Sequence, residues 1–500
     1  MLPSHIIVQA GGKGTRLEHL TQNKPKALVP VANRPMLFHL FEKYPNSEFV
    51  IIGDYKFDVL ERYLRAFAKV KYSLVRGTGH TGTCAGIAEA LDRLPPATPF
   101  LLIWSDLVLP EDFIIPEPLH DMVGLSQGFR CRWRYENDCF EEITSEDSGV
   151  AGFFVFTEKD RIKDVPTDGE FVRWLKDKRM KFQRLLLPST KEYGLLEEYN
   201  RLTPEKCRPF NQIEIRKDRV IKQPVDAQGV LLAEREAKWY ETVKNMGFHN
   251  IPRVYEMKPL TLERICGGNV YDYGVLPKEQ RQNILQEIIC CLKKLHTLDC
   301  RPADSESVYK AYVQKTFERL EKVRDLVPFA SEEVIVINGH SCRNIFYHRK
   351  EIEALIQKNM PRDFCPIHGD CTFSNIMMRE DLSPVLIDPR GYFGHTEFFG
   401  DADYDWAKLY YSLKGDYDQF NLKRFSLSIE ENGVELSIKS NGWQDLEDDF
   451  FESLGETVSM QKIKLLHALI WLSLTTYAWE NYDSVCGAFY NGLLYLEEVL

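Results

Sequence analysis

Two stretches of this chain combine glycines with charged side chains in patterns suited to phosphate chemistry. The first is the loop Gln9–Leu17, Gln-Ala-Gly-Gly-Lys-Gly-Thr-Arg-Leu, which directly follows an apolar run. Glycines let backbone N–H groups approach an anion, and a helix that begins after such a loop adds its dipole. Further along, Asn23–Pro30 contributes Lys26, which stands between a proline and an apolar run. Taken alone, the loop is also compatible with a tight turn, but loop and lysine together predict a phosphate-binding site.

The second stretch lies in the C-terminal half, where His368–Asn375 is followed by Val385–Gly391. A hydroxyl group that attacks ATP needs a carboxylate to orient it, and Mg²⁺ needs oxygen ligands beside the phosphates. Asp370 and Asn375, followed by Asp388 at the end of an apolar run, supply these groups. A single His-Gly-Asp is often just a turn, so the prediction of a phosphotransfer site rests on the ordered set.

The elements that must position the first site follow from hydrophobic periodicity. Short apolar runs indicate buried strands at Ile6–Gln9, Phe49–Ile52, Lys71–Val75 and Phe100–Trp104, with helices at Leu37–Lys43, Phe57–Lys69 and Thr83–Leu94 between them. This alternation predicts βαβ units and a mostly parallel sheet covered on both faces. A further strand at Val150–Phe156 and a helix at Gly169–Lys178 are expected after it.

The second half has a different pattern. Gln212–Ile215 and Arg219–Lys222 alternate around a short turn and predict a hairpin. From Gly229 onward the pattern is largely helical, as in Asn283–His296 and Tyr309–Arg324. The proline-containing stretch 202–209 separates the two patterns. We therefore predict two domains, residues 1–204 and residues 205–500.

Composition agrees with an ordinary globular protein of two domains, because single cores usually stop growing at roughly 250–300 residues. The net charge of −11 argues against a nucleic-acid partner. The twelve cysteines form no Cys-x-x-Cys pair, and no secretory signal precedes the first apolar run. The longest apolar stretch, Ala468–Trp479, has the length of a buried helix, so no membrane insertion is expected. We expect a soluble, cytoplasmic enzyme that can form a homo-oligomer.

Residues 1–202 resemble the sugar nucleotidyltransferase superfamily, whose signature is a glycine loop ending in Thr-Arg-Leu and a downstream Lys-x-Leu-x-Pro. The resemblance extends to Gly77–Leu91, similar to the family's base-recognising loop and helix. It implies a Rossmann-like, GT-A-like α/β domain in which a substrate phosphate attacks the α-phosphorus of a nucleoside triphosphate and pyrophosphate leaves. By the same resemblance, Arg16 and Lys26 act in catalysis. The implied nucleotide-binding residues are Gly11, Gly12, Lys13, Gly14, Thr15 and Gly82, and the implied Mg²⁺ ligands are Asp106 and Glu192.

The phosphate acceptor of this first domain is left open by a departure from the family. Many members have a Glu-Lys-Pro strand at the acceptor site, whereas this chain has Phe129–Ser148 with Arg130, Arg132 and Arg134 in alternation. Alternating arginines would share one face of a strand and could bind a phosphate. They could equally be solvated surface residues.

Residues 206–500 resemble the aminoglycoside phosphotransferase and choline kinase superfamily, which has a protein-kinase-like α+β fold. The resemblance implies Asp370 as the catalytic base, Asn375 and Asp388 as Mg²⁺ ligands, and Lys222 with Glu236 as the pair that holds the ATP phosphates; His368 is a structural residue of the loop.

This second domain also departs from its relatives. Arg208–Asn211 stands where a glycine-rich loop could precede Lys222, and Asp388-Pro389-Arg390-Gly391 replaces the Asp-Phe-Gly of protein kinases. The second departure argues against a protein substrate. Arg390 could contact a phosphate, or pair with Asp401 or Asp403.

Together the two resemblances predict a bifunctional enzyme. The kinase domain would phosphorylate a sugar or polyol with ATP, and the nucleotidyltransferase domain would join the phosphate to CTP or another nucleoside triphosphate, for surface polysaccharide precursors. One alternative is a choline kinase with a CTP:phosphocholine cytidylyltransferase, in which Trp471, Tyr477, Trp479 and Tyr482 would form an aromatic box. Core packing explains these aromatic residues as well. A second alternative is that one domain is a non-catalytic regulatory module.

Overall fold

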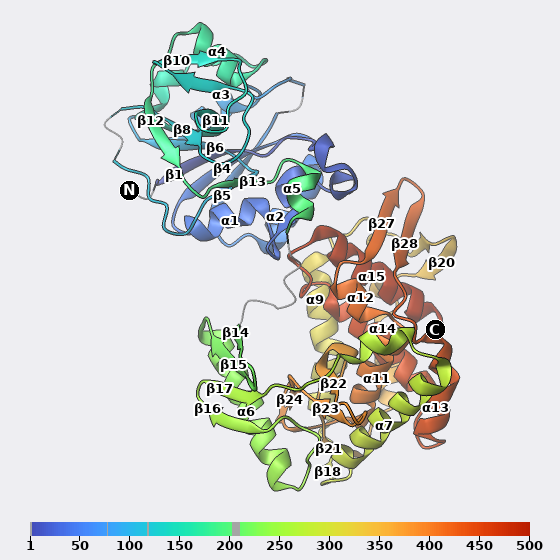
Figure 1. Ribbon diagram of the computed structural model, residues 1–500. Coiled ribbons are helices and arrows are strands. Elements are labelled where there is room, and N and C mark those ends of the chain that lie inside the picture. The colour runs from blue at the N-terminus through green and yellow to red at the C-terminus, as the bar shows by residue number, and fades with distance from the viewer. Residues whose placement is uncertain (1–2, 78, 118–119, 203–210) are drawn as a thin grey trace. The chain divides into compact units, whose positions relative to one another are not determined.

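The computed structural model describes residues 3–77, 79–117, 120–202 and 211–500 (Figure 1). The chain divides into two compact units. The first comprises Met1–Pro204 and Trp479–Asp483, and the second comprises Glu205–Ala478 and Ser484–Leu500. The predicted stretch 202–209 and the short loop Arg208–Asn211 lie almost entirely outside the described residues.

The first unit is built on a mixed sheet of nine described strands, whose main path runs β10-β9-β11-β6-β1-β4-β5 (Figure 1). The central strands β1 (His5–Gln9), β4 (Glu48–Gly53), β5 (Lys71–Arg76) and β6 (Phe100–Trp104) are parallel, as expected. The strand β11 (Gly149–Phe156), however, pairs antiparallel with β6. The remaining strands are β8 (Met122–Ser126), β9 (Arg134–Glu136), β10 (Cys139–Glu141) and β12 (Gln183–Leu187). The prediction of a mostly parallel sheet was therefore wrong, because an apolar run does not reveal strand direction.

Helices flank this sheet at α1 (Met36–Lys43), α2 (Phe57–Phe67), α3 (Ile87–Asp92) and α4 (Phe171–Asp177), and α5 (Leu196–Asn200) follows the last strands. The helix expected at Thr83–Leu94 is shorter, because Gly86 adopts a left-handed conformation immediately before Ile87. The apolar residues of β1 and all eight residues of β11 are buried. Strands buried on both faces have to be apolar throughout, and this fixes the sheet inside the unit.

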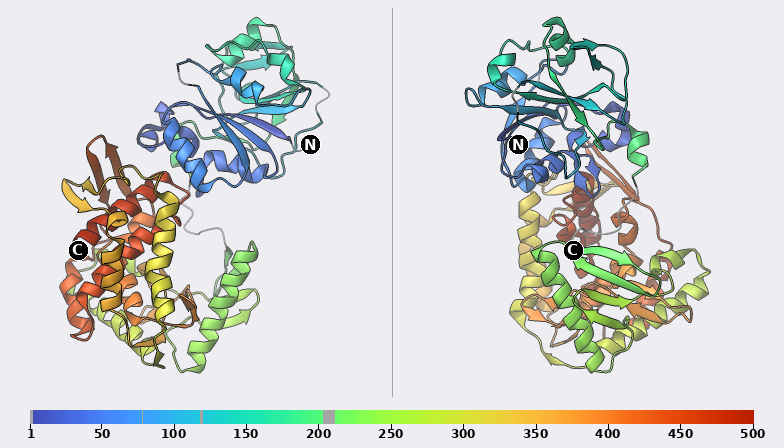
Figure 2. Two further views of the ribbon diagram at one scale, coloured as in Figure 1. Left: turned by 180° about the vertical axis from the view of Figure 1, so that it is seen from behind. Right: turned by 60° about the vertical axis from the view of Figure 1, so that its left-hand side comes forward.

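The second unit begins with an antiparallel sheet of order β14-β15-β17-β16. Its strands are β14 (Asn211–Ile215), β15 (Arg219–Pro224), β16 (Val254–Met257) and β17 (Leu260–Glu263), and the helix α6 (Ala227–Asn245) follows β15. The predicted hairpin is thus present, and it continues into a larger sheet. Figures 1 and 2 show this sheet and α6, in green, on one side of the unit and the yellow to red helices on the other.

The rest of the second unit is mainly helical. Its principal helices are α7 (Lys278–His296), α8 (Ser305–Tyr309), α9 (Lys315–Val323), α10 (Arg349–Lys358), α11 (Ala402–Leu413), α12 (Tyr417–Asn421), α13 (Glu447–Leu454), α14 (Met460–Leu474) and α15 (Tyr482–Glu497). A π-helical turn, Lys310–Gln314, joins α8 to α9. The short hairpin β22 (Ile376–Met378) and β23 (Pro384–Leu386) lies between the two halves of the predicted phosphotransfer motif.

A second sheet in this unit has the order β20-β19-β28-β27 and was not predicted. It is formed by β19 (Val334–Ile337), β20 (His340–Arg343), β27 (Phe425–Glu430) and β28 (Gly433–Ile438). In β19, exposed and buried residues alternate, which is the expected pattern of a half-buried strand. This alternating pattern is present in the sequence, but it was not recognised because each strand is short.

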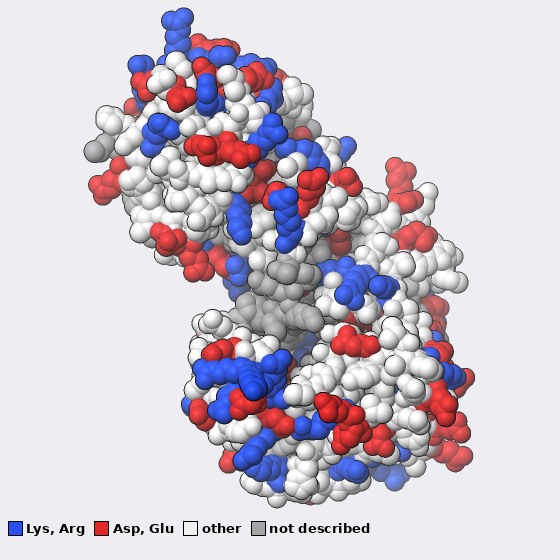
Figure 3. Space-filling model, viewed as in Figure 1, with Lys and Arg blue, Asp and Glu red and all other residues white. Residues whose placement is uncertain are grey.

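On the face drawn in Figure 3, acidic and basic side chains are interspersed over both units. Among the described residues, no helix combines the length and the apolar character required to cross a membrane.

Candidate active sites

The first candidate site is a pocket at the carboxyl ends of the parallel strands β1, β4 and β6, the edge where α/β sheets bind ligands. Five of the predicted site residues line it: Gly11, Gly12, Lys26, Gly82 and Asp106. Its wall also includes the loop that precedes α3. Gln9 holds that loop by donating hydrogen bonds from Nε2 to the carbonyl oxygens of Thr83, at 2.7 Å, and of Ala85, at 3.3 Å.

Lys26, Asp106 and Glu192 form a cluster at this pocket. Lys26 Nζ donates a hydrogen bond to Asp106 Oδ2 and lies 3.9 Å from Glu192 Oε1. Asp106 Oδ1 is buried and has no hydrogen-bond partner. Burial opposes the charge of Asp106, but Lys26 holds its pKa below the ordinary value. Burial and the neighbouring Asp106 raise the pKa of Glu192 to about 7.

These two carboxyl groups fit a divalent cation. A buried carboxylate oxygen without a partner suits a hard cation, and Mg²⁺ is commonly held by one or two carboxylates together with substrate phosphates. Short backbone contacts bring the two residues together. The strand β13 (Lys191–Glu192) pairs with β7 (Leu107–Val108), and Tyr193 N donates to Asp106 O at 3.1 Å. A Cβ atom at Gly194 would overlap Glu192 Oε1, so a side chain there would displace the Glu192 carboxylate.

The glycine loop leads into a different element from the one predicted. Gly14 has a left-handed φ of 65°, and the next element is a 3₁₀ helix (Thr15–Thr21) that is interrupted at Glu18, not an α-helix. Lys13, Thr15 and Arg16 are exposed and do not line the pocket. The expected contribution of a helix dipole is therefore not supported, because an interrupted 3₁₀ turn does not align many peptide dipoles.

Two of the three arginines near the acceptor region, Arg132 and Arg134, are paired with carboxylates. Arg132 Nε donates to Glu142 Oε1 at 3.0 Å, and Arg134 Nε donates to Glu141 Oε2 at 3.0 Å. Only Arg134 lies on a strand, β9. The two arginines therefore do not share the face of one strand, and the surface interpretation agrees with the structure.

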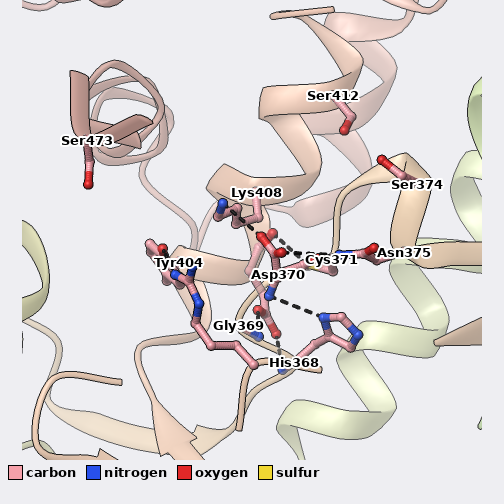
Figure 4. Close-up of polar contacts among 12 residues, drawn as sticks. His368, Gly369, Asp370, Cys371, Ser374, Asn375, Tyr404, Lys408, Ser412 and Ser473 are labelled. Atoms are coloured by element: carbon pink, nitrogen blue, oxygen red, sulfur yellow. Dashed lines mark hydrogen bonds and ion pairs between the residues drawn. The ribbon is translucent and has the colours of Figure 1, made fainter. Parts of the chain in front are cut away.

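The second candidate site is the loop that carries Asp370, drawn in Figure 4. Asp405, fully buried at the start of α11, accepts hydrogen bonds from His368 N at 2.9 Å and from Gly369 N at 2.7 Å. His296 Nε2 lies 3.0 Å from the same carboxylate. His368 connects the loop internally, because its Nδ1 accepts from Asp370 N at 3.2 Å and its Nε2 donates to Ile387 O at 2.9 Å. Burial lowers the pKa of His368, which agrees with this neutral tautomer and a structural role.

Asp370 is placed between an amide and a lysine. Asn375 Nδ2 donates to Asp370 O at 2.7 Å and to Asp370 Oδ2 at 3.2 Å, while Lys408 Nζ lies 2.8 Å from Asp370 Oδ1 (Figure 4). Burial opposes the charge of Asp370, but Lys408 and Arg390 hold its pKa well below the ordinary value. Asp370 is therefore an ionised hydrogen-bond acceptor at neutral pH.

Lys222, Glu236 and Asp388 meet beside this loop. Lys222 Nζ, on β15, lies 2.6 Å from Glu236 Oε1, on α6, and also pairs with Asp388 Oδ1. Although burial opposes its charge, the two carboxylates raise the pKa of Lys222 above its ordinary value. Asp388 has a left-handed φ of 55°, a strained conformation of the kind often found at functional sites. The predicted lysine–glutamate pair is thus present, and Asp388 adjoins it.

The second site also offers oxygen ligands of the type that Mg²⁺ prefers. Asn375 uses its amide nitrogen toward Asp370, which leaves its amide oxygen as an acceptor, and about half of the Asp388 side chain is exposed. Over the part of the chain that the structure describes, no group of three or more His, Cys, Asp and Glu side chains is arranged to hold a metal ion. Each site therefore offers only a few protein ligands. This agrees with Mg²⁺, whose coordination shell is usually completed by nucleotide phosphates.

Some site residues were missed or misassigned from the sequence. Lys408 was missed, although a lysine within the apolar helix α11 is itself a signal. Arg390 pairs with neither Asp401 nor Asp403; it donates instead from Nη1 to Tyr404 Oη at 3.2 Å, while Lys462 binds both aspartates.

Of the four residues of the predicted aromatic box, only Tyr477 lines the pocket beside Asp370. Trp471 belongs to the second unit and packs on Tyr411, with ring centroids 4.7 Å apart. Trp479 and Tyr482 belong to the first unit. Trp471 and Tyr482 are buried, as core packing requires, whereas Tyr477 and Trp479 are only partly buried.

Two segments of the chain match families of enzymes that transfer phosphate groups. Residues 6–117 match the family model of the MobA-like NTP transferase domain, and residues 212–418 match that of the phosphotransferase enzyme family. The chain therefore carries an N-terminal nucleotidyltransferase domain and a C-terminal kinase-like phosphotransferase domain. The predicted fold class, a Rossmann-like α/β domain followed by a protein-kinase-like domain, is confirmed.

Individual proteins are similar to parts of the chain. A stretch of 108 residues is 34% identical to the mannose-1-phosphate guanylyltransferase catalytic subunit beta of Dictyostelium discoideum and covers 20% of this chain and 30% of that protein. The bifunctional protein GlmU of Methanocaldococcus jannaschii is 32% identical over 108 residues, which are 21% of this chain and 26% of that protein. The chain thus spans less than a third of the length of these two curated relatives.

Solved structures are similar to each part of the chain. The inositol-1-phosphate CTP transferase of T. maritima has 15% identity and a TM-score of 0.34, covering 40% of this chain and 92% of its own. The structure of the gentamicin-APH(2")-IIa complex has 16% identity and a TM-score of 0.38, covering 58% of this chain and 89% of its own.

Proposed function

We propose that this chain is a bifunctional enzyme that phosphorylates a small alcohol with ATP and then couples the phosphate ester to CTP or another nucleoside triphosphate. The observation that carries the proposal is the convergence of Lys222, Glu236, Asp388, Asn375 and Asp370 in the second unit. A conjugate of this kind is a precursor for surface polysaccharides, which is the pathway we propose.

In the kinase step, the substrate hydroxyl oxygen attacks the γ-phosphorus of ATP, the bond to the β-phosphate oxygen breaks, and ADP leaves. Asp370, ionised and placed by Asn375 and Lys408, accepts the hydroxyl proton. Lys222, held by Glu236, is placed to bind the ATP phosphates. Asn375 and Asp388 would hold Mg²⁺, which when bound neutralises charge on the phosphates.

In the nucleotidyl step, an oxygen of the phosphate ester attacks the α-phosphorus of the nucleoside triphosphate, and pyrophosphate leaves. Lys26 lies in the pocket with the glycine loop, where its ammonium group can stabilise the negative charge that develops on the phosphate oxygens. Asp106 and Glu192 would hold Mg²⁺. Gly11, Gly12 and Gly82 leave the backbone accessible to the nucleotide, and the exposed Lys13, Thr15 and Arg16 are proposed to contact its triphosphate.

The choline alternative has less support, because only Tyr477 of its four proposed box residues lines the pocket beside Asp370. We also propose a reducing, cytoplasmic location, which is supported by the eleven described cysteines, all of them free thiols.

Two matched substitutions test the assignment. The full chain is incubated with ATP, a panel of alcohols and each nucleoside triphosphate, and ADP, pyrophosphate and new conjugates are measured. Asp370→Asn is expected to reduce ADP formation by about 10²–10⁴-fold and to leave pyrophosphate release from a supplied phosphate ester unchanged. Asp106→Asn is expected to reduce pyrophosphate release and to leave ADP formation unchanged. If either substitution leaves its own reaction intact, the assigned site does not carry that reaction. A reaction that is absent from the wild type as well would identify a non-catalytic module, and loss of both reactions in each variant would show that the sites are not independent.

A further inference from the structure

The pocket beside Asp370 carries an unusual surplus of positive charge. Four cationic side chains line it, whereas Asp370 is its single carboxylate among the described residues. The cations are Lys315, Arg319, Arg390 and Lys408. Four positive charges against one negative charge leave a surplus of three. Lys408 is paired with Asp370, so the remaining surplus belongs to the other three cations.

Among the described residues, no ion pair joins Lys315, Arg319 or Arg390 to a carboxylate, although the charge of Asp370 acts on Arg390. Arg319 Nη1 donates to Ser473 O and Oγ, both at 2.8 Å, and its guanidinium lies 4.3 Å from the Tyr477 ring centroid. Arg390 donates to Tyr404 Oη at 3.2 Å. Lys315 Nζ lies 5.6 Å from the Tyr404 ring centroid, and the described residues give it neither a carboxylate nor a hydrogen-bond acceptor.

Clustering of like charges is unfavourable without an anion. All three side chains are only half-exposed, so water compensates them incompletely. Burial and the neighbouring arginines lower the pKa of Lys315 to about 8. Burial opposes ionisation of Tyr404, but Lys315, Lys408 and Arg390 lower its pKa to about 7. Both shifts have the sign that a strongly positive site would produce.

The three cations lie in a different pocket from the residues proposed to bind ATP. Lys222, Glu236, Asn375 and Asp388 do not line this pocket, whereas Asp370 does. Lys315 and Arg319 are one turn apart on α9, so they present their charges on one face of that helix. Figure 4 shows Tyr404 and Lys408 on the same side of Asp370, and Ser473 on a separate helix, α14. Apolar residues of α14, Leu466, Leu469 and Ile470, complete the wall.

We propose that the alcohol phosphorylated by the second unit is itself an anion, bearing a carboxylate or a phosphate group that Lys315, Arg319 and Arg390 bind while its hydroxyl group faces Asp370. This inference rests on the proposed kinase activity and specifies its substrate class. The same charges disfavour choline and other cationic alcohols, which they repel. Guanidinium groups suit carboxylate and phosphate oxygens equally, so the anionic group can be either.

A matched substrate panel tests the charge preference in the full-length protein. With ATP, we would compare glycerate and glycerol 3-phosphate with glycerol, gluconate with glucitol, and choline with all of them, measuring ADP release. A charge-assisted contact is worth about 1.5–3 kcal/mol, so an anionic member is expected to exceed its neutral counterpart in kcat/KM by about 10–100-fold. Preference for glycerol, glucitol or choline would overturn the inference and leave the kinase assignment intact.

Substitutions of the pocket cations test which side chains bind the anionic group. Lys315→Met and Arg319→Met are each expected to raise the KM of the anionic alcohol by about tenfold or more, with the KM of ATP unchanged, and Lys315→Arg is expected to retain the wild-type KM. Lys322→Met is the matched control, because Lys322 is exposed on the same helix and does not line the pocket.

A binding measurement keeps the inference testable if no alcohol of the panel is phosphorylated. With the nucleotide site filled by a non-hydrolysable ATP analogue, malonate and inorganic phosphate are added and the thermal midpoint is recorded. We expect at least one anion to stabilise the wild type and not the Lys315→Met, Arg319→Met double variant. A response to malonate alone indicates a carboxylate, and a response to phosphate alone indicates a phosphate group. Equal stabilisation of both proteins, or of neither, refutes the anion site, whereas ADP formation unaffected by Asp370→Asn refutes the kinase assignment.

Discussion

Replacing Asp405 by asparagine is expected to damage the kinase site without altering any residue that contacts a substrate. The carboxylate is fully buried and receives two backbone N–H groups of the Asp370 loop, at 2.9 and 2.7 Å. An asparagine amide offers one oxygen, so one of these N–H groups would face an NH₂ group. Losing one charge-assisted hydrogen bond and leaving one buried donor unpaired costs about 3–5 kcal/mol in the free energy of unfolding.

Catalysis is expected to fall as well, because His368 and Gly369 directly precede Asp370. A displacement of about 1 Å at a reacting group can reduce the rate by about 10²-fold, and we expect a decrease of that order in kcat for ADP formation. Unfolding in urea gives the stability, and the pyrophosphate release of the first unit serves as an internal reference. Asp448→Asn is the matched control, since Asp448 is exposed on α13.

The reasoning would be refuted by a variant whose free energy of unfolding stays within about 0.5 kcal/mol of the wild type and whose kcat stays within about twofold. That result would show that Asp405 does not hold the loop. A loss of stability with an unchanged kcat would show that Asp405 stabilises the fold, and would refute its role in positioning Asp370 for catalysis.

Three further predictions concern other parts of the molecule. Gly194→Ala is expected to displace the Glu192 carboxylate and reduce pyrophosphate release while sparing ADP formation; equal loss of both reactions would indicate general misfolding instead. Burial lowers the pKa of His467 to about 3, so the unfolded chain takes up a proton first as the pH falls below about 6.5, and the histidine destabilises the fold by about 1.4 kcal/mol per pH unit. His467→Gln, which can still accept from Trp471 Nε1, is expected to remove this slope from urea titrations between pH 6 and 4, and an unchanged slope would contradict it. Removal of Mg²⁺ with EDTA is expected to abolish both reactions and its return to restore them, whereas activity that persists without divalent cations would exclude the proposed ligand sets.

Local spacing made a large part of the two sites predictable. The central strands of the first unit were found because a strand buried on both faces must be a continuous apolar run. Asp370 and Asn375 lie in one loop, where their separation alone brings them within hydrogen-bond distance. The antiparallel direction of β11 was not predictable, since it depends on pairing with the distant strand β6.

The sequence alone determined which residues suited to phosphate chemistry each half contains. The first half has a glycine loop with Lys26, and the second has an aspartate loop followed by Asp388. The tertiary structure decided which charges meet. Lys26 and Asp106 are 80 residues apart and form one ion pair, and Lys315 on α9 joins Arg390 around a single pocket. The physical reason is that periodicity specifies which face of a helix is apolar but not which element covers it. The charge of the acceptor pocket, and with it the proposed substrate class, therefore depended on the fold.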